Sequence, residues 1–185
     1  MNLLVRIKHW QLFIFLVGIP ISIQLFLIFI SLNASSNYEI VNIILGVLVP
    51  TTFFFIWQYI LGVKLHQRLP DTLKMNLNKF RILLVVPVIY ILFISFFVVK
   101  ILSLPITVNI GPYILLFFLI IPIHLFSMFC IFYCLYFNSK ALKSVELGKE
   151  AILSDYILEF FLLWFFPIGV WIIQPRINKI FSNPE

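Results

Sequence analysis

The chain has 185 residues, of which 63% are hydrophobic and only 11% are charged. Soluble domains are nearer half apolar and a quarter charged, so this composition excludes an ordinary soluble globule and indicates a protein surrounded by lipid. The apolar segments account for nearly all of the mass, which leaves no room for a soluble catalytic domain. The net charge of +6 sits in short loops between apolar runs, a distribution that fits membrane topology better than nucleic-acid binding.

Four long apolar runs predict an all-α polytopic bundle, with spanning helices at residues 10–32, 40–63, 82–103 and 110–137. Within these runs apolar residues follow one another directly, whereas the strands of a β-barrel would alternate in polarity. The first run is longer than the apolar core of roughly 7–15 residues in a cleavable signal peptide, so we expect an uncleaved anchor helix. Small residues at 33–36 leave cleavage open as the alternative.

Lysine and arginine residues are concentrated in alternate connections between the runs. One group lies before the first run, after the second and after the fourth, and comprises Arg6, Lys8, Lys64, Arg68, Lys74, Lys79, Arg81, Lys140, Lys143 and Lys149. The other connections carry only Lys100. The positive-inside rule therefore predicts that the N-terminus and the loop 64–81 are cytoplasmic. The five basic residues of that loop are also candidates for contact with anionic lipid or an acidic partner, although topology alone explains them.

The composition changes after residue 138, and this change divides the chain into two regions. We expect residues 1–138 to form the four-helix transmembrane domain. Residues 139–185 begin with mixed charges at one-turn spacing, which predicts a cytoplasmic linker helix, and continue into a membrane-associated hairpin.

A fifth apolar stretch, residues 156–173, has two interpretations. As a full span it would carry Arg176 and Lys179 to the outside, against the charge bias. As a re-entrant or interfacial helical hairpin that turns at 167–169, it would keep both inside. We favour the hairpin, because the proline and glycine in this segment make a break easy and tryptophans flank it.

The densest polar constellation comprises Asp155, Glu159, Gln174 and Arg176. Asp155 and Glu159 are one helical turn apart and share a face, and a hairpin would bring Arg176 back toward them. Ionisable groups at membrane depth are costly, so one interpretation is an acidic functional site. The interpretation that we favour is a structural clamp that holds the hairpin closed.

Each of the four runs contains a proline in its interior, at Pro20, Pro50, Pro87 and Pro122. Proline is common in membrane helices, where neighbouring groups satisfy the carbonyl oxygen that it leaves unbonded. These prolines are candidate hinges or pore-lining kinks, and ordinary membrane-helix geometry is the interpretation that we favour.

His124, Cys130 and Cys134 in the fourth run raise the question of a metal site. On a helix the two cysteines share a face, while His124 projects roughly 80–120° away, which leaves too few ligands for a closed site. We therefore expect no metal and no cofactor, and a buried His124 bonded to a neighbouring helix.

The uncharged cores of the runs lack the groups of a proton relay or an ion-coupled carrier. The sequence also has no Gly-rich phosphate loop, no His-Glu-x-x-His and no Gly-x-Ser-x-Gly. We expect no catalytic residues and a non-enzymatic accessory or scaffold subunit of a membrane complex, in contact with lipid and with a protein partner or a second copy. A small oligomeric pore or transporter, and a membrane-embedded enzyme using Asp155 or Glu159, are the alternatives.

The tail EFFLLWFFPIGVWIIQPRIN, residues 159–178, resembles a stretch of small, largely uncharacterised bacterial multi-helix inner-membrane proteins. The resemblance is confined to the last third of the chain. It implies a bacterial inner-membrane setting and carries no mechanism with it.

Overall fold

The structure is a computed structural model and describes residues 6–33, 37–70, 73–102 and 111–182. This part of the chain is all-helical, which confirms the predicted fold class. In chain order its elements are α2 (His9–Phe13), the π-helical segment η1 (Ile14–Gly18), α3 (Ile19–Asn33), α4 (Asn37–His66), α5 (Leu77–Leu102), α6 (Gly111–Leu147), α7 (Leu153–Trp164) and α8 (Phe166–Ser182).

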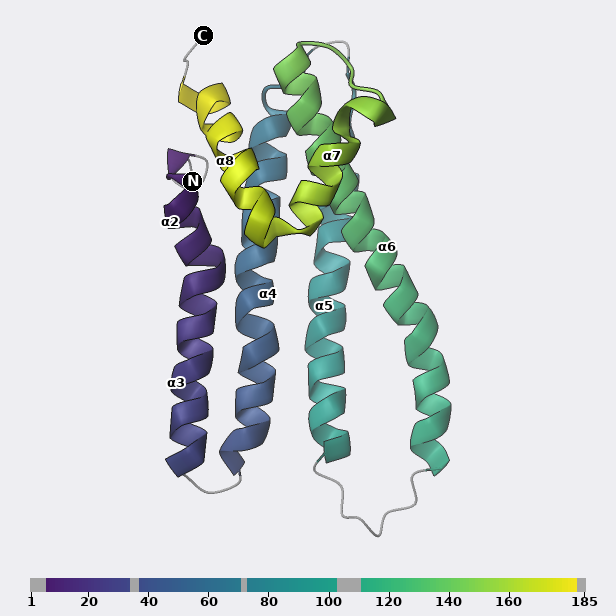
Figure 1. Ribbon diagram of the computed structural model, residues 1–185. Coiled ribbons are helices and arrows are strands. Elements are labelled where there is room, and N and C mark those ends of the chain that lie inside the picture. The colour runs from purple at the N-terminus through teal and green to yellow at the C-terminus, as the bar shows by residue number, and fades with distance from the viewer. Residues whose placement is uncertain (1–5, 34–36, 71–72, 103–110, 183–185) are drawn as a thin grey trace.

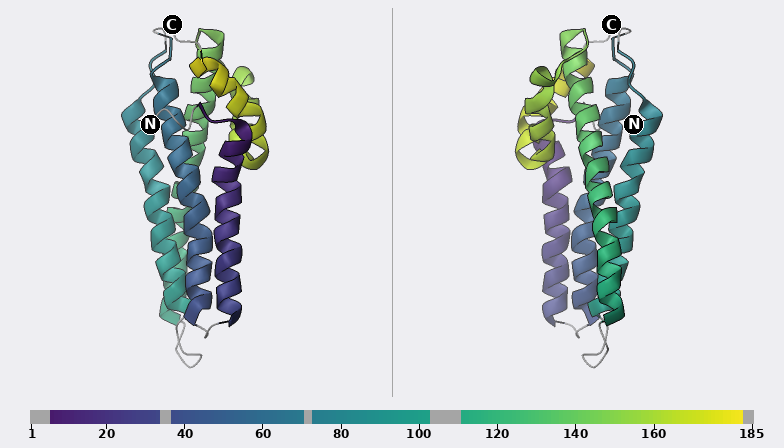
Figure 2. Two further views of the ribbon diagram at one scale, coloured as in Figure 1. Left: turned by 90° about the vertical axis from the view of Figure 1, so that its left-hand side faces the viewer. Right: turned by 90° about the vertical axis from the view of Figure 1, so that its right-hand side faces the viewer.

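The long helices run side by side, and the short α7 and α8 pack against one end of the bundle (Figure 1, Figure 2). Four segments are long and apolar enough to cross a membrane: His9–Leu32, Ile44–His66, Leu77–Ile101 and Phe118–Leu147. Apart from their ends, these segments coincide with the four predicted runs. The chain therefore has the architecture of a multi-pass integral membrane protein.

The fourth long helix extends well beyond its predicted run. α6 continues through residue 138 to Leu147, so the predicted linker helix is the last part of α6. Gly148 then adopts a positive φ of 64°, a conformation that commonly ends helices. The hydroxyl of Ser144 accepts a hydrogen bond from the backbone N–H of Ala151 at 3.0 Å. These two features turn the chain back toward α6 as it enters α7.

The buried core lies in the half of the bundle that α7 and α8 cover. It combines residues from α2, η1, α4, α6, α7 and α8, among them Leu12, Leu16, Trp57, Leu61, Leu65, Leu135, Leu142, Leu163, Ile173 and Ile177. In the other half, apolar side chains are exposed, such as Phe29 in α3 at 66% and Phe118 in α6 at 69%. Surfaces of this kind are costly in water and are stable in hydrocarbon.

Close contact between α4, α5 and α6 depends on Gly62. A Cβ atom at this position would lie 2.5 Å from the ring of Phe80 and 2.6 Å from the side-chain oxygen of Asn138. One turn earlier in α4, the buried side-chain oxygen of Gln58 accepts a hydrogen bond of 2.5 Å from the Asn138 amide. A small residue beside an interhelical amide pair is a common way to join helices within a membrane.

The first span contains a π-helical turn beside its proline. Pro20 has no N–H to bond to the carbonyl oxygen of Leu16, and η1 widens the helix immediately before it. The other three prolines lie inside helices that continue through them: Pro50 in α4, Pro87 in α5 and Pro122 in α6. A role for the four prolines as hinges remains a prediction.

Positive charge gathers at one end of the bundle, which we call the basic end. This end includes the N-terminal segment, the α4–α5 connection and the C-terminal ends of α6 and α8 (Figure 1). Of the 13 lysine and arginine residues, all but Lys100 lie there. Lys100 is in the last turn of α5, at the opposite end. The tail thus adds its two cations to the charged end instead of opposing it.

Residues 153–182 form two helices that pack together, with their junction at Phe165. The chain turns at Phe165 and not at the predicted 167–169, because Pro167 lies in the first turn of α8. N–H groups in the first turn have no acceptor within the helix, so a proline there costs no hydrogen bond. Gly169 instead permits a close approach between the two helices, since a Cβ atom there would overlap the backbone carbonyl oxygen of Leu162. The outer ends of both helices lie toward the basic end (Figure 1).

Candidate functional site

An ion-pair network joins α6, α7 and α8 at the basic end. Glu159 on α7 is only 2% exposed, and its Oε1 lies 2.6 Å from Nη2 of Arg176 on α8. The same oxygen lies 3.4 Å from Nζ of Lys143 on α6. Arg176 also donates two hydrogen bonds to Glu146 on α6, from Nε at 2.6 Å and from Nη2 at 2.5 Å. We call these four residues, Lys143, Glu146, Glu159 and Arg176, the clamp cluster.

The clamp cluster compensates a carboxylate that is removed from water. Such a group is costly to bury unless an opposite charge and hydrogen bonds accompany it. The hydrogen bond to Glu146, and secondarily that to Glu159, raises the pKa of Arg176 above its usual range, although burial acts in the opposite direction. Arg176 therefore stays protonated, and it holds carboxylates from two different helices at once.

The other two residues of the predicted constellation lie outside the clamp cluster. Oδ2 of Asp155 accepts the backbone N–H of Ile152 at 2.9 Å and so caps the start of α7. Gln174 is fully buried and donates a hydrogen bond of 3.1 Å to the backbone carbonyl oxygen of Ile7. Of the four predicted residues, the structure brings together Glu159 and Arg176.

Sequence reasoning missed the two α6 members of the clamp cluster, Lys143 and Glu146. It assigned them to a solvated linker because they lie in a charged segment after the fourth run. A glycine at 148 was the signal in the sequence that the chain could reverse there. The connection 148–152 is short, and it brings α7 back along the last turns of α6. Residues on those turns were therefore candidates for contact with the hairpin.

The last helix, α8, also contacts the N-terminal segment. The backbone carbonyl oxygen of Ile7 accepts hydrogen bonds from Gln174 at 3.1 Å and from Asn178 at 3.0 Å. The ring of His9 lies 4.9 Å from that of Trp171. Through these contacts and the clamp cluster, α7 and α8 connect the first span with the fourth.

An open hollow of about 950 Å³ lies beside the clamp cluster, between the end of α4, the end of α6 and α8. Its charged lining residues are Arg68, Glu146, Arg176 and Lys179. The guanidinium of Arg68 lies 4.7 Å from the centre of the Phe181 ring. It also donates a hydrogen bond to the backbone carbonyl oxygen of Ile180. The hollow is thus a polar site at the basic end with an arginine held in place.

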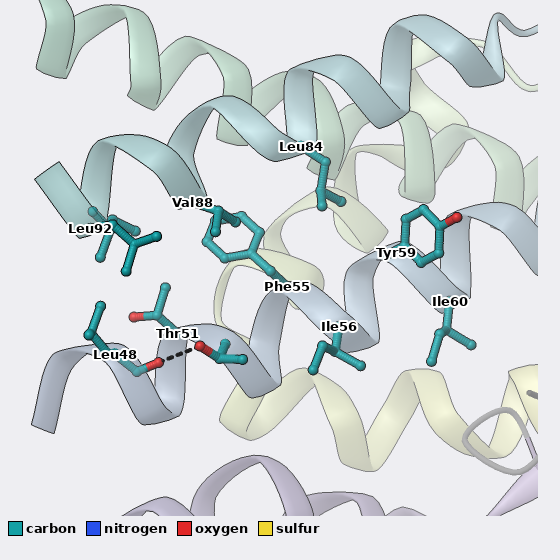
Figure 3. A pocket seen from close by; sticks show the side chains of 11 residues that line it. Leu48, Thr51, Phe55, Ile56, Tyr59, Ile60, Leu84, Val88 and Leu92 are labelled. Atoms are coloured by element: carbon teal, nitrogen blue, oxygen red, sulfur yellow. Dashed lines mark hydrogen bonds between the residues drawn. The ribbon is translucent and has the colours of Figure 1, made fainter. Parts of the chain in front are cut away.

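An apolar groove of about 360 Å³ lies between α4 and α5 within the candidate spans (Figure 3). The hydroxyls of Thr51 and Thr52 are bonded to carbonyl oxygens one turn earlier in α4, at 2.5 and 2.7 Å. The remaining walls are mostly hydrocarbon, including Phe55 and Val88. The groove therefore suits an acyl chain or an apolar side chain and offers little for polar chemistry.

The five basic residues of the predicted contact loop have different surroundings. Arg68 lines the hollow. Lys64 donates a hydrogen bond to a neighbouring glutamine, and Lys79 lies over a tyrosine ring of α6. Lys74 and Arg81 are exposed. The loop is therefore not one uniform patch, and Arg68 is the member that lines the hollow.

The described residues contain no group of three His, Cys, Asp or Glu side chains that could hold a metal ion. His124 is hydrogen-bonded to the hydroxyl of Tyr90 on α5 at 3.0 Å, which confirms the expected bond to a neighbouring helix. Its side chain is exposed, however, and the expectation of burial was wrong. The neighbouring residues Ile123 and Leu125 are exposed as well, so this stretch of α6 is largely uncovered.

The described residues thus offer three features with distinct chemistry. The clamp cluster joins helices, the groove takes hydrocarbon, and the hollow presents cations. No protein-family model, curated protein or solved structure matches the chain.

Proposed function

We propose that the protein is a non-enzymatic accessory or scaffold subunit of a membrane complex. The observation that carries this proposal is the clamp cluster, whose buried carboxylate is used to join three helices. A catalytic carboxylate must be reachable by a substrate, and Glu159 is only 2% exposed. Asp155, the other candidate, is engaged in capping α7. Both acidic groups therefore support a structural role over an enzymatic one.

The polar groups at span depth also favour a scaffold over a pore. A conducting path needs polar groups or water through the depth of the membrane. Gln58 bonds to Asn138 between α4 and α6, and Gln24 bonds to Asn42 between α3 and α4 at 2.7 Å. These amides are used between helices, where they hold the bundle together.

We infer that the basic end faces the cytoplasm of a bacterial cell and that the spans lie in its inner membrane. The positive-inside rule supports this orientation, because the charge asymmetry between the two ends is nearly complete. The resemblance of the tail to bacterial inner-membrane proteins supports the choice of membrane. The N-terminus would then be cytoplasmic.

We further infer that α7 and α8 enter the cytoplasmic half of the bilayer and leave on the same side. The 12 residues of α7 extend ~18 Å, about half of a hydrocarbon core of ~30 Å. Phe165 and Ile168 at the junction are 60% and 67% exposed, and such apolar side chains are stable in lipid. The polar outer ends of the two helices would stay at the interface.

The outer half of α6 supports a role in assembly. Apolar side chains on several of its faces are exposed at Phe118, Leu119, Ile121, Ile123, Leu125 and Phe126. These side chains form a large apolar surface that neighbouring molecules in the membrane could cover.

Native mass spectrometry after extraction in mild detergent tests the proposal. We expect masses above the 21.8 kDa of one chain that include a second, reproducibly associated polypeptide. A second test uses liposomes that contain only the purified protein and a trapped ion indicator. We expect these liposomes to stay sealed. Ion flux through them, or a lone chain in native extracts, would contradict the scaffold proposal.

A further inference from the structure

We propose that the hollow at the basic end binds a phosphate-bearing anion. The hollow has a volume of about 950 Å³, and three separate parts of the chain form its walls. Small-molecule sites in proteins have volumes of roughly 300–1,000 Å³. The proposal goes beyond the scaffold role and does not depend on it.

The charge of the lining favours an anion. The described lining residues include three cations, Arg68, Arg176 and Lys179, and one carboxylate, that of Glu146. Glu146 is itself bound by Arg176 through two hydrogen bonds, so its repulsion toward an incoming anion is reduced. The described lining residues therefore carry more positive than negative charge.

Arg68 is positioned in advance of binding. Its guanidinium lies over the Phe181 ring and donates to the backbone carbonyl oxygen of Ile180, so its side chain is held between α4 and α8. A guanidinium has five N–H donors in a planar arrangement that matches the oxygens of a phosphate group. Because the side chain is already held, less conformational entropy is lost when a phosphate binds.

Two kinds of molecule carry the required group. One is an anionic phospholipid, whose headgroup phosphate would lie at the level of the basic end. The other is a free phosphate or a soluble phosphate ester. Basic pockets between membrane helices on the cytoplasmic side are typical sites for lipid headgroups. Leu69, Pro70 and Ile180 in the lining could contact the glycerol and the first acyl carbons of a lipid.

The test uses the full-length purified protein and two probes. The first is phosphatidylglycerol in a phosphatidylcholine background, with retained lipid counted by native mass spectrometry. The second is inorganic phosphate added to protein in phosphatidylcholine alone, with binding followed by thermal stabilisation. Lys179→Gln and Arg68→Gln each remove one cation from the hollow. Arg81→Gln removes the same charge from the same end, at an exposed position outside the hollow, and is the matched control.

We expect Lys179→Gln and Arg68→Gln to weaken the binding of one probe by about tenfold, the effect of one lost charge-assisted contact. Arg81→Gln should weaken it by less than about twofold, since exposed charges at a distance are screened. Retention of phosphatidylglycerol would identify a lipid headgroup, and stabilisation by phosphate alone would identify a soluble ligand. Because Arg68 also contacts the end of α8, Lys179→Gln decides the question if Arg68→Gln does not fold.

Two results would overturn the proposal. The first is that neither probe binds. The second is that Lys179→Gln and Arg81→Gln weaken binding equally, which would mean that anions are attracted to the basic end in general and not to the hollow. Either result leaves the scaffold proposal unaffected, because that proposal is tested by associated polypeptides and by sealed liposomes.

Discussion

Glu159 of α7 and Arg176 of α8 form an ion pair of 2.6 Å across the helical junction at Phe165. The two side chains differ in environment, since the carboxylate is 2% exposed and the guanidinium 27%. Arg176 also reaches Glu146 on α6. The ion pair therefore joins a buried carboxylate on α7 to a more accessible guanidinium on α8. Substitution of either residue should change the free energy of unfolding by a different amount.

We expect Arg176→Gln to lower the free energy of unfolding by about 3 kcal/mol, because it leaves Glu159 buried with only Lys143 nearby. Glu146→Gln should cost about 1 kcal/mol or less, since that carboxylate is more accessible and the buried pair remains. Unfolding in detergent micelles, followed by circular dichroism, measures both.

A double substitution separates a buried charge from a simple loss of contacts. In Arg176→Gln with Glu159→Gln, the uncompensated carboxylate is gone, so the pair of changes should cost less than the sum of the single ones. Strict additivity would contradict the interpretation of the clamp cluster as a compensated buried charge.

We expect Gly169→Ala to loosen the packing of α8 on α7, because the added methyl group would overlap the carbonyl oxygen of Leu162. Overpacking against backbone costs about 2–3 kcal/mol. Gly18→Ala is the matched control, since a Cβ atom there would meet the side chain of Ile14 at an ordinary 3.5 Å. Thermal unfolding of the two variants gives the comparison. Similar losses in both would show that helix–helix contact at Gly169 is not the cause.

The four spans could be predicted because the bilayer imposes length and polarity on every one of them. The junction of the hairpin could not be placed, because Phe165 carries no turn signal. Pro167 and Gly169 looked like the turn, yet Pro167 starts α8 and Gly169 fits the space beside Leu162. Proline and glycine permit several local structures, and only tertiary packing selects among them.

Half of the clamp cluster could be predicted from the sequence. Glu159 and Arg176 were visible as rare charges in an apolar segment, where each needs a partner. Glu146 was not visible, because its role depends on α6 continuing beyond the apolar run and on the reversal at Gly148. Gln174 was grouped with the acidic residues of α7, but its amide donates to the backbone of Ile7, a contact that leaves no trace in side-chain patterns.

We expect Gln174→Ala to release the N-terminal segment from α8. The substitution removes one of two hydrogen bonds to the carbonyl oxygen of Ile7 and leaves a buried gap, with a cost of about 2 kcal/mol. Hydrogen exchange at the amides of residues 8–12 should rise by at least about tenfold, since each 1.4 kcal/mol is tenfold in an opening equilibrium.

Asn178→Ala is the control for that change. It removes the other hydrogen bond to Ile7 from a less buried position, so its effect on exchange should be smaller. Unchanged exchange in Gln174→Ala would show that other contacts, such as those of Trp171, hold the segment.

Single cysteines can report on which side of the membrane the tail lies. The two native cysteines, Cys130 and Cys134, are buried at 0% and 2% exposure and should give little background. We expect Ser182→Cys and Gln67→Cys to react with a membrane-impermeant maleimide in inside-out vesicles, because both exposed positions lie at the basic end. In right-side-out vesicles these two variants should stay unlabelled.

The informative control is Lys100→Cys, at an exposed position in the last turn of α5 and at the opposite end. It should show the reverse pattern, with reaction only in right-side-out vesicles. If Ser182→Cys followed Lys100→Cys instead of Gln67→Cys, the α7–α8 segment would cross the bilayer. Arg176 would then be carried away from Glu146, and the clamp cluster could not form in the membrane, because its members would need to lie on one side.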